Sequence, residues 1–321
     1  MPFARLASAT TPTCHIGLGL AAVGRPGYIN LGRDHDLPAG RSVEALRERT
    51  HELLDAAYAQ GVRYFDVARS YGRAEEFLAG WLPGHGDVVV GSKWGYRYVA
   101  DWRVDADVHE IKDHSLAAFT RQLAETRALL GDHLAVYHVH SATLDTGVLD
   151  DAELHAALAA LRDSGVRVGV STSGPEQEAA IRKAVGVTVG GAPLFTSIQA
   201  TWNVLETSAG GALADAAAAG CSVIVKEAVA NGRLTGAEAV DDRVAAVSAE
   251  LGIAVDQLAI AAALAQPWAA TVLSGAATSE QLTSNLAAAA VGLPPAALDE
   301  LAELAEPPAE YWATRSRRPW A

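Results

Sequence analysis

Ionisable side chains stand at the ends of three consecutive apolar segments of this chain. Asp66, Lys93 and His140 close runs rich in Val, Phe and Tyr, and Tyr71 follows Asp66 by a few residues. A buried Asp beside a buried Lys keeps both charged, because each offsets the desolvation of the other. A Tyr hydroxyl beside such a lysine has its pKa lowered, which improves it as a proton donor near neutral pH. With a histidine hydrogen-bonded to a bound oxygen, these groups would polarise and protonate a C=O bond.

These residues can act together only in a fold that brings the ends of several strands close to one another. The alternation of strand-like and helix-like segments along the chain predicts such a fold. Eight short apolar, β-branched segments alternate with segments of helical spacing, several of which end at Gly or Pro. The expected strands are residues 15–20, 64–68, 87–93, 134–140, 166–172, 195–200, 221–227 and 270–276. The expected helices are residues 43–60, 74–82, 115–130, 151–164, one from 175, 209–219, those within 241–266, 279–290 and one from 294.

Strict alternation leaves two architectures, an open doubly wound sheet or a closed parallel barrel. An open dinucleotide-binding sheet usually carries G-x-G-x-x-G after its first strand, and the glycines from Gly17 to Gly24 miss that spacing. The count of eight favours an α/β fold of the (β/α)8 TIM-barrel type, formed as one domain by residues 1–321. We expect the C-terminal helix and tail, about residues 295–321, to pack near the barrel mouth. Active sites of such barrels lie at the C-terminal ends of the strands, where the ionisable groups stand.

The composition excludes several classes of binding partner. The formal net charge of −13 argues against nucleic acid as the main partner, because phosphate binding needs a basic face. No segment approaches the ~18 uninterrupted apolar residues of a membrane span. The two cysteines, Cys14 and Cys221, match no zinc or CxxC spacing and fit a reducing compartment. We therefore expect a cytoplasmic protein without a metal that acts on a small molecule.

Five segments of the chain resemble signatures of the aldo-keto reductase superfamily, in the same order. They are residues 64–72 (YFDVARSYG, for D-x-x-x-x-Y-G), 88–95 (VVVGSKWG, for S-K-x-G), 134–141 (LAVYHVHS), 168–171 (VGVS) and 274–285 (SGAATSEQLTSN). The resemblance runs from about residue 17 to residue 285. It implies an oxidoreductase that transfers a hydride between a nicotinamide cofactor and its substrate.

The resemblance also assigns roles to single residues. Tyr71 would be the general acid in reduction, and Lys93 would lower its pKa. Asp66 would hold Lys93, while His140 would orient the substrate oxygen. The residues that would bind the cofactor are Ser171 and Gln199 at the nicotinamide amide, Asn231 and Gly232 at the pyrophosphate, and Gly275, Thr278, Gln281 and Asn285 at the adenosine.

Three readings of the function remain open. The leading one is NAD(P)H-dependent reduction of an aldehyde or ketone to an alcohol. The second is NAD(P)-dependent dehydrogenation of a sugar or alcohol, with Tyr71 as base, and the third is a non-catalytic, cofactor-binding regulatory barrel. NADP(H) is the family's default cofactor. Ala277 and Gln281 stand where many NADPH-specific members carry Arg or Lys, which keeps NAD(H) open.

Aromatic residues after the strands are candidates for a substrate wall. Tyr28, in the loop after the first strand, and Trp94, after the third, are the two that we select, although Trp94 fits ordinary rim packing equally well. His138 is the rival of His140, since both point to the same side of one strand. The position of His140 at the strand end favours it, and His138 is then expected one layer deeper.

Overall fold

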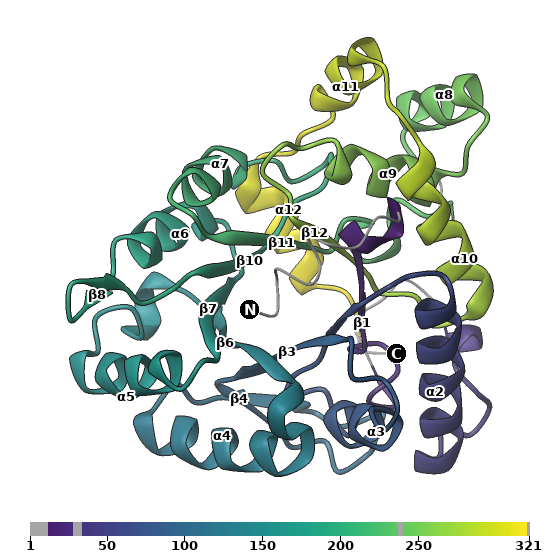
Figure 1. Cartoon of the computed structure of the whole chain (residues 1–321). Helices are drawn as coiled ribbons and strands as arrows, with labels where there is room; N and C mark the ends of the chain where they lie inside the picture. The colour runs from purple at the N-terminus through teal and green to yellow at the C-terminus, as the bar shows by residue number, and fades with distance from the viewer. Residues whose placement is uncertain (1–11, 28–33, 237–239, 320–321) are drawn as a thin grey trace.

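Eight parallel strands close into a barrel with helices around it (Figure 1). This computed structural model describes residues 12–27, 34–236 and 240–319. In sequence order, which is also the order around the barrel, the strands are β1 (Ile16–Gly19), β2 (Tyr64–Asp66), β3 (Val89–Trp94), β6 (Leu134–Ala142), β7 (Arg167–Thr172), β10 (Ser197–Thr201), β11 (Ser222–Lys226) and β12 (Thr271–Ser274). β12 pairs back onto β1, which closes the ring and confirms the predicted (β/α)8 fold.

The helices between the strands start and stop where the sequence provides caps. Ser42, Ser115 and Asp151 each accept a hydrogen bond from a backbone N–H in the first turn that follows, which satisfies one of the free donors there. The helices are α2 (Val43–Ala59), α3 (Ala74–Trp81), α4 (Leu116–Leu130), α5 (Ala152–Asp163), α6 (Gln177–Val185), α7 (Gly210–Ala218), α8 (Asp242–Leu251), α9 (Val255–Leu264), α10 (Ser279–Ala287), α11 (Pro295–Ala302) and α12 (Pro308–Ser316). Short 3-10 segments span Pro12–His15, Asp34–Asp36, Gly131–His133, Leu144–Thr146, Ala230–Gly232 and Ala288–Ala290.

The inside of the barrel is filled by side chains. Tyr64, at the start of β2, is fully buried and reaches across to β3. A side chain at Gly91 of β3 would collide with the Tyr64 hydroxyl, so the glycine is needed for this close approach. The barrel is therefore a packed core, and its chemistry has to lie above it, at the ends of the strands.

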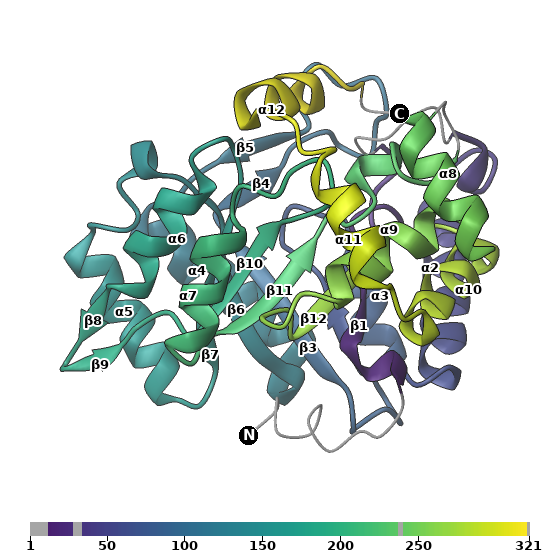
Figure 2. The ribbon, with the colours of Figure 1, turned by 90° about the horizontal axis from the view of Figure 1, so that it is seen from above.

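Two short hairpins were not expected from the sequence. β4 (Tyr96–Tyr98) and β5 (Glu110–Lys112) pair antiparallel within the long segment after β3, and β8 (Thr188–Val189) pairs with β9 (Ala192–Pro193). Figure 2 shows α12 lying at the same end of the barrel as β4 and β5. The hairpin and the C-terminal helix therefore frame the end of the barrel toward which the strands run.

Among the described residues, no single helix is long and apolar enough to cross a membrane; the bent pair of α8 and α9 meets that test only when taken together.

Candidate active site

A buried ion pair lies where β2 and β3 end. Lys93 Nζ donates to Asp66 Oδ1 and, at 3.1 Å, to the carbonyl oxygen of Val67. The second carboxylate oxygen of Asp66 accepts from Gln199 Nε2 of β10 at 2.8 Å, across the barrel. Both charged side chains are 3% exposed or less. Because the two charges are paired and hydrogen-bonded, the cost of their burial is largely offset.

Tyr71 is held over this pair by a tight turn. Gly72 has a φ of +59°, and a Cβ there would lie 2.5 Å from the carbonyl oxygen of Gly24. This loop is also fixed by a hydrogen bond from Arg73 N to the same oxygen, at 2.8 Å. The turn brings the Tyr71 ring to 4.9 Å from Lys93 Nζ. The Tyr-Gly pair of the sequence is thus explained by backbone geometry, since only glycine adopts this conformation without strain.

His140 completes the group from β6. Its ring centroid lies 5.6 Å from that of Tyr71, edge to face, and its Nδ1 is 3.4 Å from Ser70 Oγ. His114 Nε2 donates to the backbone oxygen of His140 at 2.9 Å and so fixes this end of the strand. His138 is fully buried one layer deeper, where its Nε2 lies 2.9 Å from Ser197 Oγ. Only His140 of the two rivals lines the cavity described below.

The protonation of the site differs from the expectation in one respect. Burial and the negative charge of Asp66 raise the pKa of Tyr71 well above its ordinary value. The sequence led us to expect a lowered pKa through Lys93, and that direction is wrong. The physical reason is first that burial disfavours the charged tyrosinate, and second that the carboxylate of Asp66 lies close to the Tyr71 side chain. Burial and the charge of Lys93 lower the pKa of His140 well below its ordinary value, so at neutral pH the site holds a protonated phenol beside a neutral imidazole.

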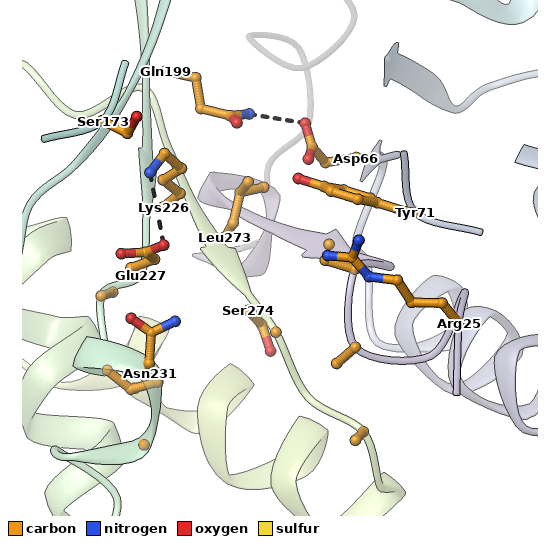
Figure 3. Close-up of a pocket in the computed structure, with 18 of the residues that line it drawn as sticks. Arg25, Asp66, Tyr71, Ser173, Gln199, Lys226, Glu227, Asn231, Leu273 and Ser274 are labelled. Carbon is orange, nitrogen blue, oxygen red and sulfur yellow. Dashed lines mark hydrogen bonds and ion pairs between the residues drawn. The ribbon is translucent and has the colours of Figure 1, made fainter. Parts of the chain in front are cut away.

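One cavity of about 290 Å³ runs from this group across the barrel mouth. Asp66, Tyr71 and His140 line one end, and Ala277 and Gln281 line the other. Figure 3 shows that Tyr71 lies beside Asp66, whereas Ser274 and Asn231 lie farther along the cavity wall. An elongated ligand can therefore reach both the ion-pair end and the start of α10.

Five of the eight predicted cofactor residues line the cavity. They are Gln199, Asn231, Gly232, Gly275 and Gln281.

Ser171, Thr278 and Asn285 are not among the lining residues, because each is used inside the protein. Ser171 Oγ accepts from Ser141 N at 2.8 Å, and Thr278 Oγ1 caps α10 by accepting from Gln281 N at 3.2 Å. The amide of Asn285 meets Ser274 Oγ at 2.8 Å. The resemblance assigns these residues to the cofactor, and that role stays a prediction.

Comparison with known proteins decides the family. The profile described as "Aldo/keto reductase family" matches residues 27–306. The chain belongs to the aldo/keto reductase family. It is therefore an oxidoreductase.

Solved structures agree with this aldo/keto reductase in fold. The aldo-keto reductase AKR11C1 from Bacillus halodurans, in its holo form, is 21% identical with a TM-score of 0.69, over 91% of this chain and 92% of that one. A presumed aldo-keto reductase from Pseudomonas aeruginosa is 24% identical with a TM-score of 0.63, over 86% and 89% of the two chains. No curated protein matches the chain significantly.

Of the two residues selected as a substrate wall, Trp94 is described in the structure of this aldo/keto reductase, and it does not contribute to such a wall. Trp94 is fully buried, with its ring 5.1 Å from that of Phe119, and does not line the cavity. Its side chain points between β3 and α4, which corresponds to packing rather than to substrate contact. Tyr28 lies outside the described residues. Tyr96, from the hairpin that the sequence did not indicate, lines the cavity with its ring 5.0 Å from that of His140.

Arg25 and Glu110 are further lining residues that sequence reasoning missed. Arg25 Nη1 donates to the backbone oxygen of Ser70 and to Glu110 Oε2, both at 2.9 Å, and its guanidinium lies 5.3 Å from the Tyr71 ring centroid. Arg25 comes from the irregular segment after β1, and Glu110 is the first residue of β5. No motif marks them, because their positions depend on how two loops meet.

A second charged group closes the cavity opposite Tyr71. Arg315 of α12 donates through Nε to both carboxylate oxygens of Glu227, at 2.9 and 3.1 Å, and Lys226 Nζ donates to Thr201 Oγ1 at 2.7 Å. The charges of Arg315 and Lys226 overcome burial and lower the pKa of Glu227 to about 2. Burial lowers the pKa of Lys226 to about 8. Glu227 has a φ of +58°, a strained backbone at the end of β11.

Proposed function

We propose that this aldo/keto reductase reduces an aldehyde or a ketone to an alcohol, with hydride from NADPH or NADH and with Tyr71 as the general acid. One observation carries the proposal: Tyr71 lines the cavity with its ring 4.9 Å from the Nζ of the buried Lys93 and 5.6 Å from the ring of His140. The raised pKa keeps the Tyr71 hydroxyl protonated at neutral pH, so the proton is present when the substrate arrives. Its transfer then depends on stabilisation of the tyrosinate by the charge of Lys93.

Each residue of the site has a separate role in carbonyl reduction. His140 and Tyr71 present polar atoms to a carbonyl oxygen that enters the cavity. A bound reduced nicotinamide would supply the hydride to the carbonyl carbon. The Tyr71 hydroxyl gives its proton to the oxygen, so that one hydride and one proton convert C=O to CH–OH. The tyrosinate left behind lies near the ammonium of Lys93, which stabilises it in a site of low polarity.

The cavity fits a dinucleotide by its chemistry. Asn231 Oδ1 is buried at the cavity wall, and among the described residues it has no hydrogen-bond partner. At Gly275 an added Cβ would meet nothing within 4 Å, so the wall is open there. Together with Gly232 and Gln281, these residues would hold the pyrophosphate and the adenosine, while Gln199 stands at the catalytic end. NADP(H) is the family's default and NAD(H) the alternative.

The reverse reaction, dehydrogenation of a sugar or alcohol, is a second candidate. It uses the same residues, with Tyr71 as base, and therefore needs its deprotonated form. The raised pKa of Tyr71 disfavours that form at neutral pH, so oxidation should gain on reduction as the pH rises.

The cavity wall favours a substrate that carries hydroxyl groups, since it is lined by the Arg25–Glu110 and Arg315–Glu227 ion pairs.

Isotope transfer tests the proposal directly. The purified protein is incubated with dinucleotide deuterated at the hydride position and with a panel of aldehydes, ketones and aldoses. We expect deuterium on the carbinol carbon of the product, read by mass spectrometry. Binding of the dinucleotide without transfer to any carbonyl, and without the reverse transfer from alcohols, would instead support the non-catalytic barrel.

A further inference from the structure

A kink in β6 sets the position of His140. Ser141, the next residue, has a φ of +51°, a conformation that residues other than glycine rarely adopt. The pairing of β6 with β7 also shifts register between Val139 and Ala142, so the strand is irregular where His140 and Ser141 lie. A strained backbone of this kind persists only where surrounding groups hold it in place. The kink therefore needs contacts from outside the strand.

Three side chains from outside β6 make such contacts. His114 Nε2 donates to the backbone oxygen of His140 at 2.9 Å. Lys112 Nζ of β5 donates to the backbone oxygen of Ser141 at 3.1 Å, and Ser171 Oγ of β7 accepts from Ser141 N at 2.8 Å. Of the three, His114 is the one that bonds the backbone of His140 itself. It does so from the segment between β5 and α4, and it is not among the described residues that line the cavity.

The ring of His114 is fixed in its own place. It lies edge to face against Trp94, at a centroid distance of 5.9 Å. A Cβ at Gly95 would lie 2.4 Å from Cδ2 and 2.7 Å from Nε2 of His114, so only glycine leaves room for the ring. Asp113 N also donates to the backbone oxygen of Gly95, at 2.8 Å. The glycine that closes the S-K-x-G segment is thus explained by the close approach of His114.

The hydrogen bond from His114 has a defined direction. Burial lowers the pKa of His114 to about 4, so at neutral pH its ring carries a single proton. Because a carbonyl oxygen only accepts, that proton lies on Nε2. The Nδ1 of His114 is buried and has no hydrogen-bond partner among the described residues. Within the described part of the chain, the hydrogen bonding of this ring is therefore directed to the strand end that carries His140.

We propose that His114 is a positioning residue, which sets the place of the His140 ring for the substrate oxygen through the backbone of β6. The inference rests on the proposed function, in which His140 presents a polar atom to the carbonyl. His140 Nδ1 meets Ser70 Oγ at 3.4 Å, which is long for a hydrogen bond, so the backbone has to hold the ring in place. A displacement of about 1 Å between a catalytic group and its substrate can lower a rate by about 100-fold.

Replacements of His114 that differ in reach test the proposal. His114→Gln keeps an N–H donor at a reach similar to that of Nε2, whereas the shorter amide of His114→Asn stops short of the carbonyl oxygen. His114→Met fills a similar volume without a donor. We expect kcat of carbonyl reduction to fall about 10- to 100-fold in His114→Met and His114→Asn, and to stay within about threefold of the wild type in His114→Gln.

Two further measurements separate positioning from a merely structural role. The dissociation constant of the dinucleotide, measured by fluorescence, should stay within about twofold in all three variants, because His114 is not among the described cavity residues. In protein labelled with isotope at the histidine ring nitrogens, the NMR signals of His140 are assigned by their loss in His140→Asn. We expect these signals to move in His114→Met and to return to their wild-type position in His114→Gln. A structural role alone would lower the free energy of unfolding without this pattern.

His133→Met is the matched control. His133 directly precedes β6, at the opposite end of the strand from His140. The variant should equal the wild type in kcat, in dinucleotide binding and in the NMR signals of His140. A loss of kcat as large as that of His114→Met would mean that the contact with His140 is not the cause, which overturns the proposal.

The outcomes separate the inference from the proposed function. Wild-type kcat in His114→Met, or a loss in His114→Gln as large as that in His114→Asn, overturns the role of His114 while carbonyl reduction stands. A dinucleotide affinity that falls in proportion to kcat overturns it as well. Lack of turnover of any carbonyl or alcohol by folded wild-type protein contradicts the proposed function, and the NMR signals of His140 then decide whether His114 positions its ring. Should His114→Met fail to fold, the comparison of His114→Gln with His114→Asn still decides the matter.

Discussion

The two tyrosines of the cavity allow a matched test of the general acid. Both Tyr71 and Tyr96 line the cavity, and their ring centroids lie 5.6 and 5.0 Å from that of His140. Only Tyr71 also lies beside the buried ion pair, with its ring centroid 4.9 Å from Lys93 Nζ. Tyr71→Phe removes one oxygen atom at that place, and Tyr96→Phe removes the same atom on the other side of His140.

The expected loss follows from the role of the hydroxyl. A positioned general acid contributes about 10²–10⁴-fold in rate, or ~2.7–5.5 kcal/mol of barrier. We expect Tyr71→Phe to lower kcat of carbonyl reduction by that factor. The ring contacts with Arg25, Lys93 and His140 do not involve the hydroxyl, and the main influences on the Tyr71 pKa are burial and charges. The free energy of unfolding should therefore change by less than about 1 kcal/mol.

Three measurements on each variant complete the test: steady-state kcat, the dissociation constant of the dinucleotide, and urea unfolding. Tyr71→Phe should lose kcat alone, and Tyr96→Phe should lose less than about tenfold, since it lacks the neighbouring ammonium. Retention of kcat within tenfold by Tyr71→Phe would refute the assignment. An equal loss in Tyr96→Phe would show that the polarity of the cavity matters and that neither hydroxyl is the proton donor.

Three other changes test the charged groups of the site. Asp66→Asn leaves Lys93 as a buried cation without its carboxylate partner, which should lower the free energy of unfolding by about 3–5 kcal/mol. Urea titration measures this loss, and adding Lys93→Met to Asp66→Asn should largely reverse it. Glu227 has a pKa of about 2 in the folded protein against an ordinary value of 4.5, so its contribution to stability is full above pH 4.5 and is lost as the pH falls toward 2. Arg315→Gln should raise the pKa of Glu227 in the folded protein, and the free energy of unfolding measured across that range should then fall less with acid. Lys226 lines the cavity with a pKa of about 8, so its positive charge is lost as the pH rises through that value and binding of the anionic dinucleotide should weaken. A pH titration of Lys226→Met should show no such step. An equal step in the variant would assign the titration to another group.

Alternation along the sequence was enough to predict the barrel and the place of its chemistry. The strand segments were correctly identified because a fully buried parallel strand reads as a short apolar run, and a run between helical segments has few other interpretations. Once eight such strands close in order, the ends of β2, β3 and β6 are neighbours. Asp66, Lys93 and His140 therefore come together for a topological reason.

The cavity residues that the sequence analysis missed come from segments outside the barrel strands. Arg25, Asp36, Tyr96 and Arg315 line the cavity, but they come from a turn, a 3-10 segment, a hairpin and the C-terminal helix. Segments of this kind carry no periodicity that fixes where a side chain points. Trp94 shows the converse error: its position at a strand end suggested a cavity wall, while its side chain is buried against Phe119 of α4.

The sequence by itself determined the fold, the family and the residues at the strand ends, because these depend on residue type and on periodic spacing. Tertiary structure alone decided the electrostatics. The pKa of Tyr71 is raised, since the folded chain keeps water from the hydroxyl and places the carboxylate of Asp66 near it. Likewise, Asp36 meets Gln281 only because the segment before α2 lies against the start of α10 in the folded chain. Charge and solvation depend on distances between segments remote in sequence, and those distances exist only in the folded chain.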